Sequence, residues 1–100
     1  MSTLVLEKDP AILGVEIDDG YLTVNLVDGR SLRVPLSWYP RLDVAAAAER
    51  RNWRLLGDGY AIEWPDLDEH IGIEGLFAGR RSGESERSLG EWLATRPPTA

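Results

Sequence analysis

The segment from Glu63 to His70 comes nearest to a chemical site in this sequence. Four carboxylates precede the single histidine there, namely Glu63, Asp66, Asp68 and Glu69. Carboxylates and an imidazole together can bind a divalent metal ion or act as acid and base in catalysis. In the structural alternative, Asp66 or Asp68 caps the following helical turn, while Glu69 and His70 face solvent. We favour this alternative, because a metal site usually takes ligands from a second segment and the chain has no other histidine.

No nucleophile in the sequence has the context that catalysis by His70 would need. None of the serines lies in the strand–turn–helix setting of a nucleophile elbow. Gly57-Asp58-Gly59 lacks the lysine and the following helix of a phosphate-binding loop. The absence of cysteine excludes disulfides, thiolate zinc sites and a thiol nucleophile. We therefore predict no enzymatic activity, no metal and no cofactor, and a metal-dependent enzyme using Asp66, Asp68 and His70 is the least favoured alternative.

Arginines gather around the predicted central helix and suggest a second kind of chemistry. They are Arg41, Arg50, Arg51 and Arg54. Arginines in such a group can contact nucleic-acid phosphates, but they also balance neighbouring carboxylates such as Glu49. The formal net charge of −6 and the pI of about 4.7 argue against non-specific binding to a phosphate backbone. A small DNA-binding regulatory domain is therefore an alternative, and a protein partner is the preferred hypothesis.

The four tryptophans are numerous for a chain of 100 residues. Trp38, Trp53 and Trp64 fall at junctions between predicted elements, where a large ring covers the end of a small core. Trp92 differs because it follows a polar segment, and it docks either within the chain or onto another chain. Since tryptophan is enriched at binding hot spots, we predict that Trp92 and its neighbour Leu93 bind a partner.

A three-stranded antiparallel meander between Ile12 and Leu36 is the clearest structural prediction. Asp19-Gly20 and Asp28-Gly29 interrupt alternating apolar residues. Asp-Gly is a strong hairpin signal, because type I′ turns need positive φ at both central positions. Period-two alternation predicts one core-facing side for the first strand, formed by Leu13, Val15 and Ile17. A short opening strand is expected at Thr3–Leu6.

The other face of the meander carries polar and aromatic side chains. They are Tyr21, Thr23, Asn25, Ser31 and Arg33. This face is either solvated or a pairing surface, because a small meander leaves edges that invite strand addition or dimerisation. We predict that Tyr21 and Arg33 bind a partner, with Trp92 and Leu93 as the alternative interface.

The remaining elements complete an α+β fold. Pro40 and the alanine-rich run that ends at Arg51 predict a central helix. Arg54–Leu56 and Tyr60–Trp64 predict a second β-hairpin. Two short C-terminal helices are expected at Ile73–Ala78 and Ser88–Thr95, the second with the capping-box spacing of Ser88 and Glu91. We assign residues 1–79 to a single α+β domain and residues 80–100 to a polar linker and a short helix.

Bulk properties place the chain among ordinary globular proteins. It has 43% hydrophobic and 28% charged residues. No apolar run approaches the ~20 residues of a membrane helix, and the segment from Met1 to Pro10 lacks the apolar core of a signal peptide. We therefore predict a cytoplasmic protein that does not bind membranes.

Several short motifs occur in an order typical of one family. They are Asp28-Gly29-Arg30, Val34-Pro35-Leu36, Tyr39-Pro40-Arg41-Leu42, Asn52-Trp53 and Trp64-Pro65-Asp66-Leu67-Asp68. Between about Val15 and Gly79 the chain resembles the domain-of-unknown-function 2442 family. The resemblance implies a small bacterial α+β domain with no established enzymatic activity. Members are often encoded beside another small uncharacterised protein, of the domain-of-unknown-function 4160 family, in an arrangement similar to toxin–antitoxin pairs.

These observations lead to one preferred hypothesis. We expect a non-enzymatic protein-interaction module, the antitoxin-like component of a two-protein bacterial system, whose partner is a small basic toxin-like protein. A homodimer is the other partner hypothesis. Some longer relatives carry a C-terminal helix-turn-helix that would bind DNA, but the segment after Gly79 is too short for that module. The sequence leaves open which of the two predicted interfaces is used.

Overall fold

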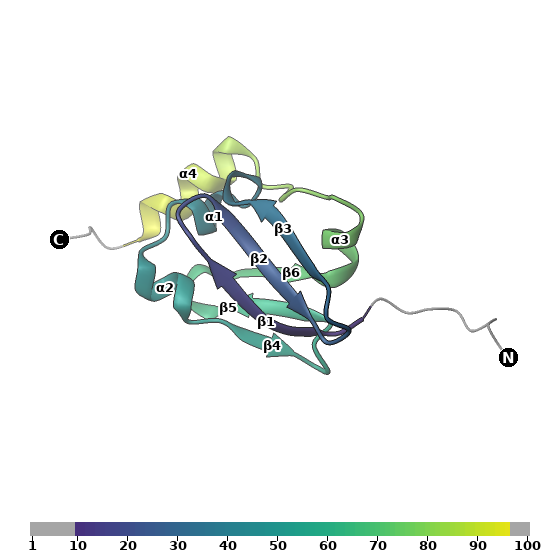
Figure 1. The fold of residues 1–100 in the computed structure, drawn as a ribbon. Helices are drawn as coiled ribbons and strands as arrows, with labels where there is room; N and C mark the ends of the chain where they lie inside the picture. Colours follow the sequence, from purple (N-terminus) through teal and green to yellow (C-terminus); the bar gives the residue numbers. More distant parts are fainter. Residues whose placement is uncertain (1–9, 97–100) are drawn as a thin grey trace, which may run out of the picture.

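The computed structural model describes residues 10–96 (Figure 1). These residues form two three-stranded antiparallel sheets with short helices around them. This is the α+β fold that the sequence predicts. The strand expected at Thr3–Leu6 lies outside the described residues. Within residues 10–96 no helix is both long enough and apolar enough to cross a membrane.

The first sheet is the predicted meander. It consists of β1 (Ile12–Ile17), β2 (Tyr21–Leu26) and β3 (Ser31–Pro35), in that order. The expected turn geometry is wrong in detail, because Gly29 has a positive φ of 94° while Gly20 and both turn aspartates do not. Asp18 instead closes the first turn, since its carboxylate accepts hydrogen bonds from the backbone N–H groups of Gly20 and Tyr21 at 3.0 and 2.8 Å.

A β-bulge at Leu13 changes the face that this residue occupies. Ile12 lies opposite Leu26 and Gly14 lies opposite Asn25, so Leu13 is an extra residue in β1. Its side chain is 65% exposed, and the prediction that Leu13 faces the core is wrong. Ile12 is buried in its place, while Val15 and Ile17 pack against the core as predicted.

The second sheet contains a strand that the sequence did not reveal. β4 (Arg54–Leu56) and β5 (Ala61–Trp64) form the predicted hairpin, and β6 (Glu69–Gly72) pairs with β5 on its other side. The short 3-10 turn Pro65–Leu67 and the left-handed backbone of Asp68, with φ of 51°, reverse the chain between β5 and β6. Aspartate tolerates this conformation better than most residues.

The predicted central helix is two helices, α1 (Pro40–Asp43) and α2 (Ala47–Arg51). Arg50 ends the first, because its guanidinium donates to the carbonyls of Leu42 and Asp43 at 2.9 and 2.8 Å. Ala46 is extended, and its backbone N–H donates to the Glu49 carboxylate at 2.9 Å. These side-chain bonds to the backbone outweigh the helix propensity of the alanine run.

Two further helices follow the second sheet. α3 (Ile73–Phe77) agrees with the prediction. α4 (Glu86–Thr95) begins two residues before the predicted start, because Ser85 rather than Ser88 is its cap. The Ser88 backbone N–H donates to the Ser85 hydroxyl at 3.0 Å.

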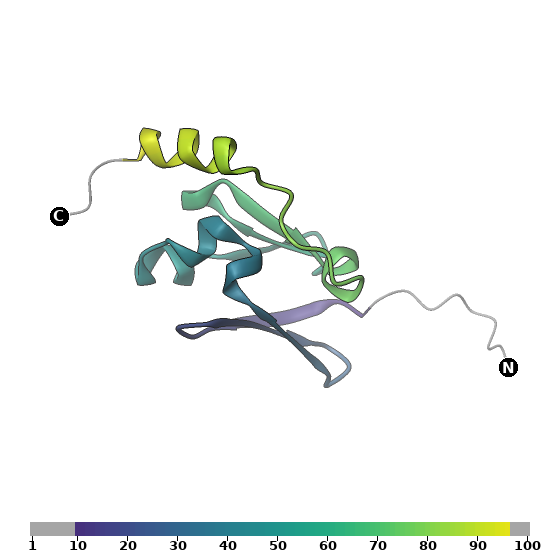
Figure 2. The same cartoon turned by 90° about the horizontal axis from the view of Figure 1, so that it is seen from above.

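One core lies between the two sheets, which face each other in Figure 2. The fully buried side chains come from both sheets and from the helical segment between them, and include Leu22, Val24, Leu42, Ile62 and Trp64. The Trp64 indole N–H donates to the Arg50 carbonyl at 3.1 Å. At one end the sheets meet directly, since the Ile12 N–H donates to the Gly59 carbonyl at 2.8 Å. No described helix covers the outer face of the first sheet, which therefore remains accessible.

Candidate functional site

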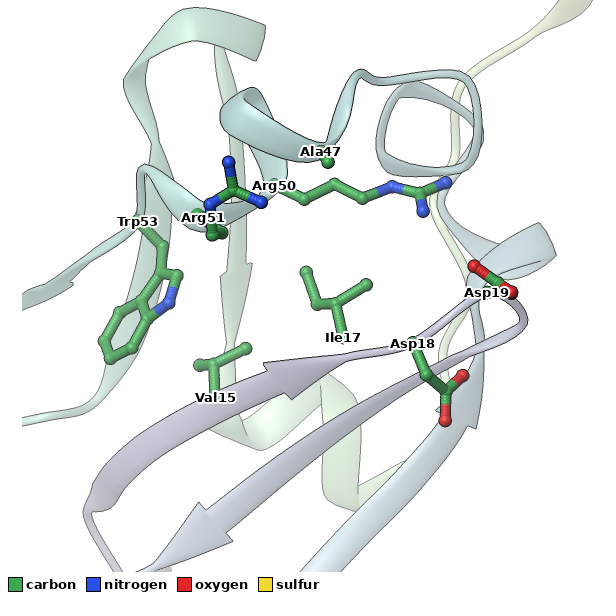
Figure 3. Close-up of a pocket in the computed structure, with 8 residues that line it drawn as sticks. All are labelled: Val15, Ile17, Asp18, Asp19, Ala47, Arg50, Arg51 and Trp53. Atoms are coloured by element: carbon green, nitrogen blue, oxygen red, sulfur yellow. The ribbon is translucent and has the colours of Figure 1, made fainter.

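A cavity of about 250 Å³ opens between β1 and the segment formed by α2 and the residues before β4 (Figure 3). Its lining residues are Val15, Ile17, Asp18, Asp19, Ala47, Arg50, Arg51 and Trp53. Two stretches of chain that are separated in sequence thus build its two sides. The cavity lies at the side of the sandwich where β1 is the edge strand of the first sheet.

The walls of the cavity are apolar. Val15 and Ile17 project from β1 toward α2, and Trp53 lies across from Val15 in Figure 3. All three side chains are half-buried and pack against the core. Ala47 adds a small exposed side chain at the start of α2. The short alanine side chain leaves space between α2 and β1.

Two of the charged residues at the cavity are held by the chain itself. Hydrogen bonds from the backbone N–H groups of Gly20 and Tyr21 lower the pKa of Asp18. The Asp18 carboxylate also lies 3.9 Å from the Arg33 guanidinium. Arg50 is committed to the α1 carbonyls described above. Arg50 therefore shapes the cavity, whereas the exposed Asp18 carboxylate keeps its negative charge at the rim.

Asp19 and Arg51 are the other two charged residues at the cavity. Neither forms an ion pair or a side-chain hydrogen bond with any residue from 10 to 96, and both are exposed. A carboxylate and a guanidinium therefore flank the apolar walls with their bonding capacity unused. A bound chain segment could satisfy both groups while its apolar side chain fills the space between them.

The structure brings two of the predicted partner-binding residues together. Tyr21 and Arg33 lie on the outer face of the first sheet, on adjacent strands. The Arg33 guanidinium is 3.9 Å from the centroid of the Tyr21 ring, a cation–π arrangement. Tyr21 is 41% exposed. The pair is preorganised and accessible, and its role in binding remains a prediction.

The other predicted partner-binding residues lie on α4. Trp92 is half-buried and packs against the core, with the Arg41 and Arg96 guanidinium carbons 4.8 and 4.6 Å from its ring centroid. Of the two environments expected for Trp92, the structure thus shows docking within the chain. Leu93 is 42% exposed.

Arg41 attaches the start of α4 to the rest of the chain. Its Nε and Nη2 donate to the two carboxylate oxygens of Glu84, each at 2.7 Å. Its Nη1 donates to the carbonyls of Leu67 and Asp68, each at 3.1 Å. The bond to Arg41 lowers the pKa of Glu84, whose side chain is only 8% exposed. The segment predicted as a polar linker is therefore bonded to α1, and Arg41 also bonds α1 to the turn between β5 and β6.

A second ion pair attaches the end of α4. Arg96 donates to the Glu49 carboxylate on α2 at 2.6 Å. The Ala46 backbone N–H and the Arg96 side chain together lower the pKa of Glu49. We refer to Arg41, Glu49, Glu84, Trp92 and Arg96 as the α4 seat.

The acidic segment near His70 does not converge on a site. Asp66 accepts a hydrogen bond from the Asn52 amide at 2.9 Å, and Asp68 lies 3.8 Å from Arg41. The expectation that Asp66 or Asp68 caps a helical turn is wrong, because β6 follows them and Gly72 precedes α3 without a side-chain cap. Glu69 is half-buried and burial raises its pKa, whereas His70 is exposed as predicted. No metal-binding group of three acidic, histidine or cysteine side chains occurs within the described range.

Three of the four arginines considered for nucleic-acid binding are engaged within the chain. Arg41 and Arg50 make the hydrogen bonds described above, and Arg54 donates to Glu63 on the neighbouring strand at 2.6 Å. Arg51 is the one member of this group whose side chain makes no bond to residues 10–96, so it is available for an external contact.

Fold and site define a small two-sheet α+β domain with a mixed-charge cavity at one open side. The chain belongs to the DUF2442 family, a family of proteins of unknown function, whose model matches residues 12–82. The resemblance stated from the sequence motifs is confirmed. The matched segment includes every residue of the cavity and ends before α4.

Two solved structures of similar fold are also uncharacterised proteins. A crystal structure of a protein of unknown function from Rhodospirillum rubrum has a TM-score of 0.66 and 24% identity, and the match covers 77% of this chain and 95% of that one. A solution structure of an uncharacterised protein from Chromobacterium violaceum has a TM-score of 0.63 and 19% identity, covering 86% and 79%. At these identities the likeness shows the fold alone. None of the curated proteins matches the chain.

Sequence reasoning did not find the cavity. The sequence predicts core positions for Val15 and Ile17, a junction for Trp53 and a surface cluster for Arg51. The approach of α2 to β1 depends on the break at Ala46, which helix propensity does not predict.

Proposed function

We propose that this chain is a non-enzymatic protein-interaction module that receives a segment of a partner protein in the cavity between β1 and α2. We assign it the role of antitoxin-like component of a cytoplasmic two-protein bacterial system, with a small basic protein as its partner. The observation that carries the proposal is the cavity itself, where Asp19 and Arg51, neither bonded to a side chain within the described part of the chain, flank apolar walls. Concave, mostly apolar sites with a few convergent polar groups are typical binding sites.

The residue types at the cavity favour binding over catalysis. Its lining contains carboxylates, guanidinium groups and apolar side chains, but no serine, cysteine, histidine or lysine. Asp18 and Asp19 are its only groups that could act as acid or base, and the backbone hydrogen bonds that lower the pKa of Asp18 make that carboxylate a weaker base. The lining residues therefore support recognition of a mixed apolar and charged group.

The volume favours a protein segment over a free small molecule. Cavities for drug-sized ligands typically measure ~300–1,000 Å³, and this one measures about 250 Å³. A space of this size suits one or two side chains of a segment whose backbone stays outside. Such side-chain anchors in pockets dominate the affinity of many protein interfaces.

A cavity-filling substitution tests the proposal. Ala47 lines the cavity and is exposed, so Ala47→Phe should fill it without disturbing the core. Ala48 is the matched control, because it lies on the same helix, is exposed and does not line the cavity. The tagged chain is used to capture its partner from the native lysate, and mass spectrometry identifies and quantifies that partner.

We expect the unmodified chain and Ala48→Phe to retain a stoichiometric small basic protein at moderate salt, and Ala47→Phe to lose it. Melting temperatures of the two variants within a few degrees of each other would show that folding is not the cause. Equal capture by both variants would exclude the cavity as the binding site. The absence of any partner would contradict the interaction-module function.

A further inference from the structure

The edge of β1 beside the cavity has backbone groups that no described residue satisfies. The Asp18 N–H donates to the Tyr21 carbonyl, and the Val27 N–H donates to the Ala11 carbonyl. The bond between Asp18 and Tyr21 lies on the same side of the Leu13 bulge as Val15 and Ile17, so it fixes the phase of the β1–β2 ladder there, in which alternate residues face the partner strand. In this register, the N–H and C=O groups of Val15 and Ile17 point away from β2.

The second sheet covers only the start of this edge. There the Ile12 N–H bonds to the Gly59 carbonyl. Further along β1, no backbone group between residues 10 and 96 bonds to the outward-pointing groups of Val15 and Ile17. The outward-pointing backbone groups of two alternate residues are thus without a partner in the described chain where the cavity begins. Strand addition requires this geometry.

The side chains of β1 determine which residue types an added strand needs at each position. Val15 and Ile17 point into the cavity, whereas Glu16 between them is exposed on the outer face of the first sheet. Side chains of paired strands share faces position by position. A segment paired with β1 would therefore place alternate side chains in the cavity and beside Glu16.

The outer side of this edge is acidic. Glu16 and Asp18 belong to β1 and its turn, and Asp19 follows them. Among residues 10–96, Arg33 is the one cation that pairs with any of these carboxylates; it lies two strands away in the sheet and 3.9 Å from Asp18. Basic side chains opposite Glu16 and Asp18 would be favoured, since opposite charges on paired strands are stabilising.

The same charges argue against a second copy of the chain as the occupant. A symmetric antiparallel pair that aligns the open residues, Val15 with Ile17 of the other copy, places Glu16 directly opposite Glu16. Like charges directly opposite each other destabilise a strand pair, and charged edge residues commonly prevent self-association. The edge is therefore complementary to a different, basic chain.

We propose that β1 binds an extended segment of the partner by strand addition, and that this segment alternates apolar and basic residues. Its backbone pairs with Val15 and Ile17, its apolar side chains enter the cavity toward Trp53, and its basic side chains lie against Glu16 and Asp18. The inference rests on the proposed function and specifies the chemistry of the partner. The proposed function itself requires only that the cavity receives a side chain.

Synthetic peptides test this specificity on the full chain. The probe is an acetylated and amidated heptapeptide that alternates lysine and valine. One comparison peptide has glutamate in place of lysine, and another has the same lysines and valines in two blocks rather than alternating. Backbone amide shifts and hydrogen exchange by NMR report where each peptide binds. We expect the alternating lysine peptide to bind at least about tenfold more tightly than either comparison peptide and to protect the amides of Val15 and Ile17.

Charge reversal provides the matched protein variants. Glu16→Lys should remove the preference for the lysine peptide. Glu74→Lys makes the same change in net charge at an exposed position on α3 and should leave the preference unchanged. Equal binding of the lysine and glutamate peptides, or equal effects of the two variants, would overturn the charge specificity.

The outcomes separate this inference from the proposed function. Binding without protection of Val15 and Ile17 would overturn strand addition, and so would failure of all peptides to bind. Either result is compatible with loss of the natural partner in Ala47→Phe, which would leave the cavity as the binding site. Retention of that partner by Ala47→Phe would instead overturn the proposed function.

Discussion

The α4 seat and the cavity beside β1 contain the same residue types, but within the described chain the charged side chains are paired in the seat and partly without partners in the cavity. In the seat, Trp92 lies between two arginines, and each of these arginines pairs with a carboxylate of the same chain. The cavity also combines a tryptophan with arginines and aspartates. There, however, Asp19 and Arg51 have no partner among residues 10–96. The same residue types therefore form an internal contact in the seat and keep two exposed charges in the cavity.

Removal of the Arg41 side chain should have the largest effect on stability. Arg41→Ala breaks the two bonds to Glu84 and leaves that carboxylate, 8% exposed, without its cation. We expect a loss of about 3 kcal/mol, because an uncompensated buried charge is costly. Arg51→Ala should change stability by less than about 0.5 kcal/mol, as a surface substitution does. Urea unfolding of both variants measures the difference, and similar losses would remove the contrast between seat and cavity.

Truncation of Trp92 should have the next largest effect. Trp92→Ala removes a half-buried ring that packs on the core, and we expect a loss of about 2 kcal/mol. Faster hydrogen exchange of the α4 amides would locate the loss in the seat, with Leu93→Ala as the more exposed control. Unchanged exchange together with weaker partner capture would instead identify Trp92 as the intermolecular anchor that the sequence suggested.

Acidification should first raise and then lower the free energy of unfolding. Burial raises the pKa of Glu69 above its usual 4.5, so the folded state binds that proton more tightly and stability rises as pH falls through the raised pKa. Hydrogen bonds from Arg41 and from the Ala46 N–H lower the pKa values of Glu84 and Glu49 below 4.5. Their contribution is complete above pH 4.5 and is lost as pH falls through the lowered values.

Urea midpoints measured across this pH range test both signs. Glu69→Gln should abolish the rise, and Glu84→Gln should reduce the fall. The fall should be smaller than the effect of Arg41→Ala, because the bonds from Arg41 to the carbonyls of Leu67 and Asp68 survive protonation of Glu84. A monotonic decline in the unmodified chain would contradict the raised pKa of Glu69.

Neutralisation of Asp19 should have the smallest effect on stability. Asp19→Asn removes an exposed charge without a bond to residues 10–96, and we expect a change within about 0.5 kcal/mol. Partner capture or peptide binding should weaken in the same variant if the cavity rim is used. A loss of stability comparable to that of Arg41→Ala would show that Asp19 is part of the folded framework.

Local sequence patterns predicted the first sheet, but they did not predict features that depend on contacts between residues far apart in the sequence. The Asp-Gly turns and period-two alternation located β1, β2 and β3. The same alternation could not reveal the bulge at Leu13, because a bulge depends on how β1 pairs with β2. The sequence does not predict β6, because Glu69 and His70 make its first half polar. The strand forms through pairing with β5, which local patterns do not show.

The candidate site was even less accessible from the sequence. Arg41 and Glu84 are far apart in the chain, so their bidentate pair could not be inferred from spacing. The resulting position of Trp92 could not be inferred either. Val15 and Ala47 have local signals for a strand and a helix rather than for a site, and they meet at the cavity because α2 is displaced from α1 at Ala46.

The hydrogen bond between Ile12 and Gly59 has a consequence for the order in which the chain folds. Every strand pair in both sheets joins consecutive strands, so each sheet can form through short loop closures. The bond from Ile12 to Gly59 instead closes a long loop between the two sheets. It needs a glycine, because the φ of residue 59 is 94° and a Cβ there would lie only 2.7 Å from the Ile12 carbonyl oxygen. We expect the sheets to form first and to dock at this point late, after the folding transition state.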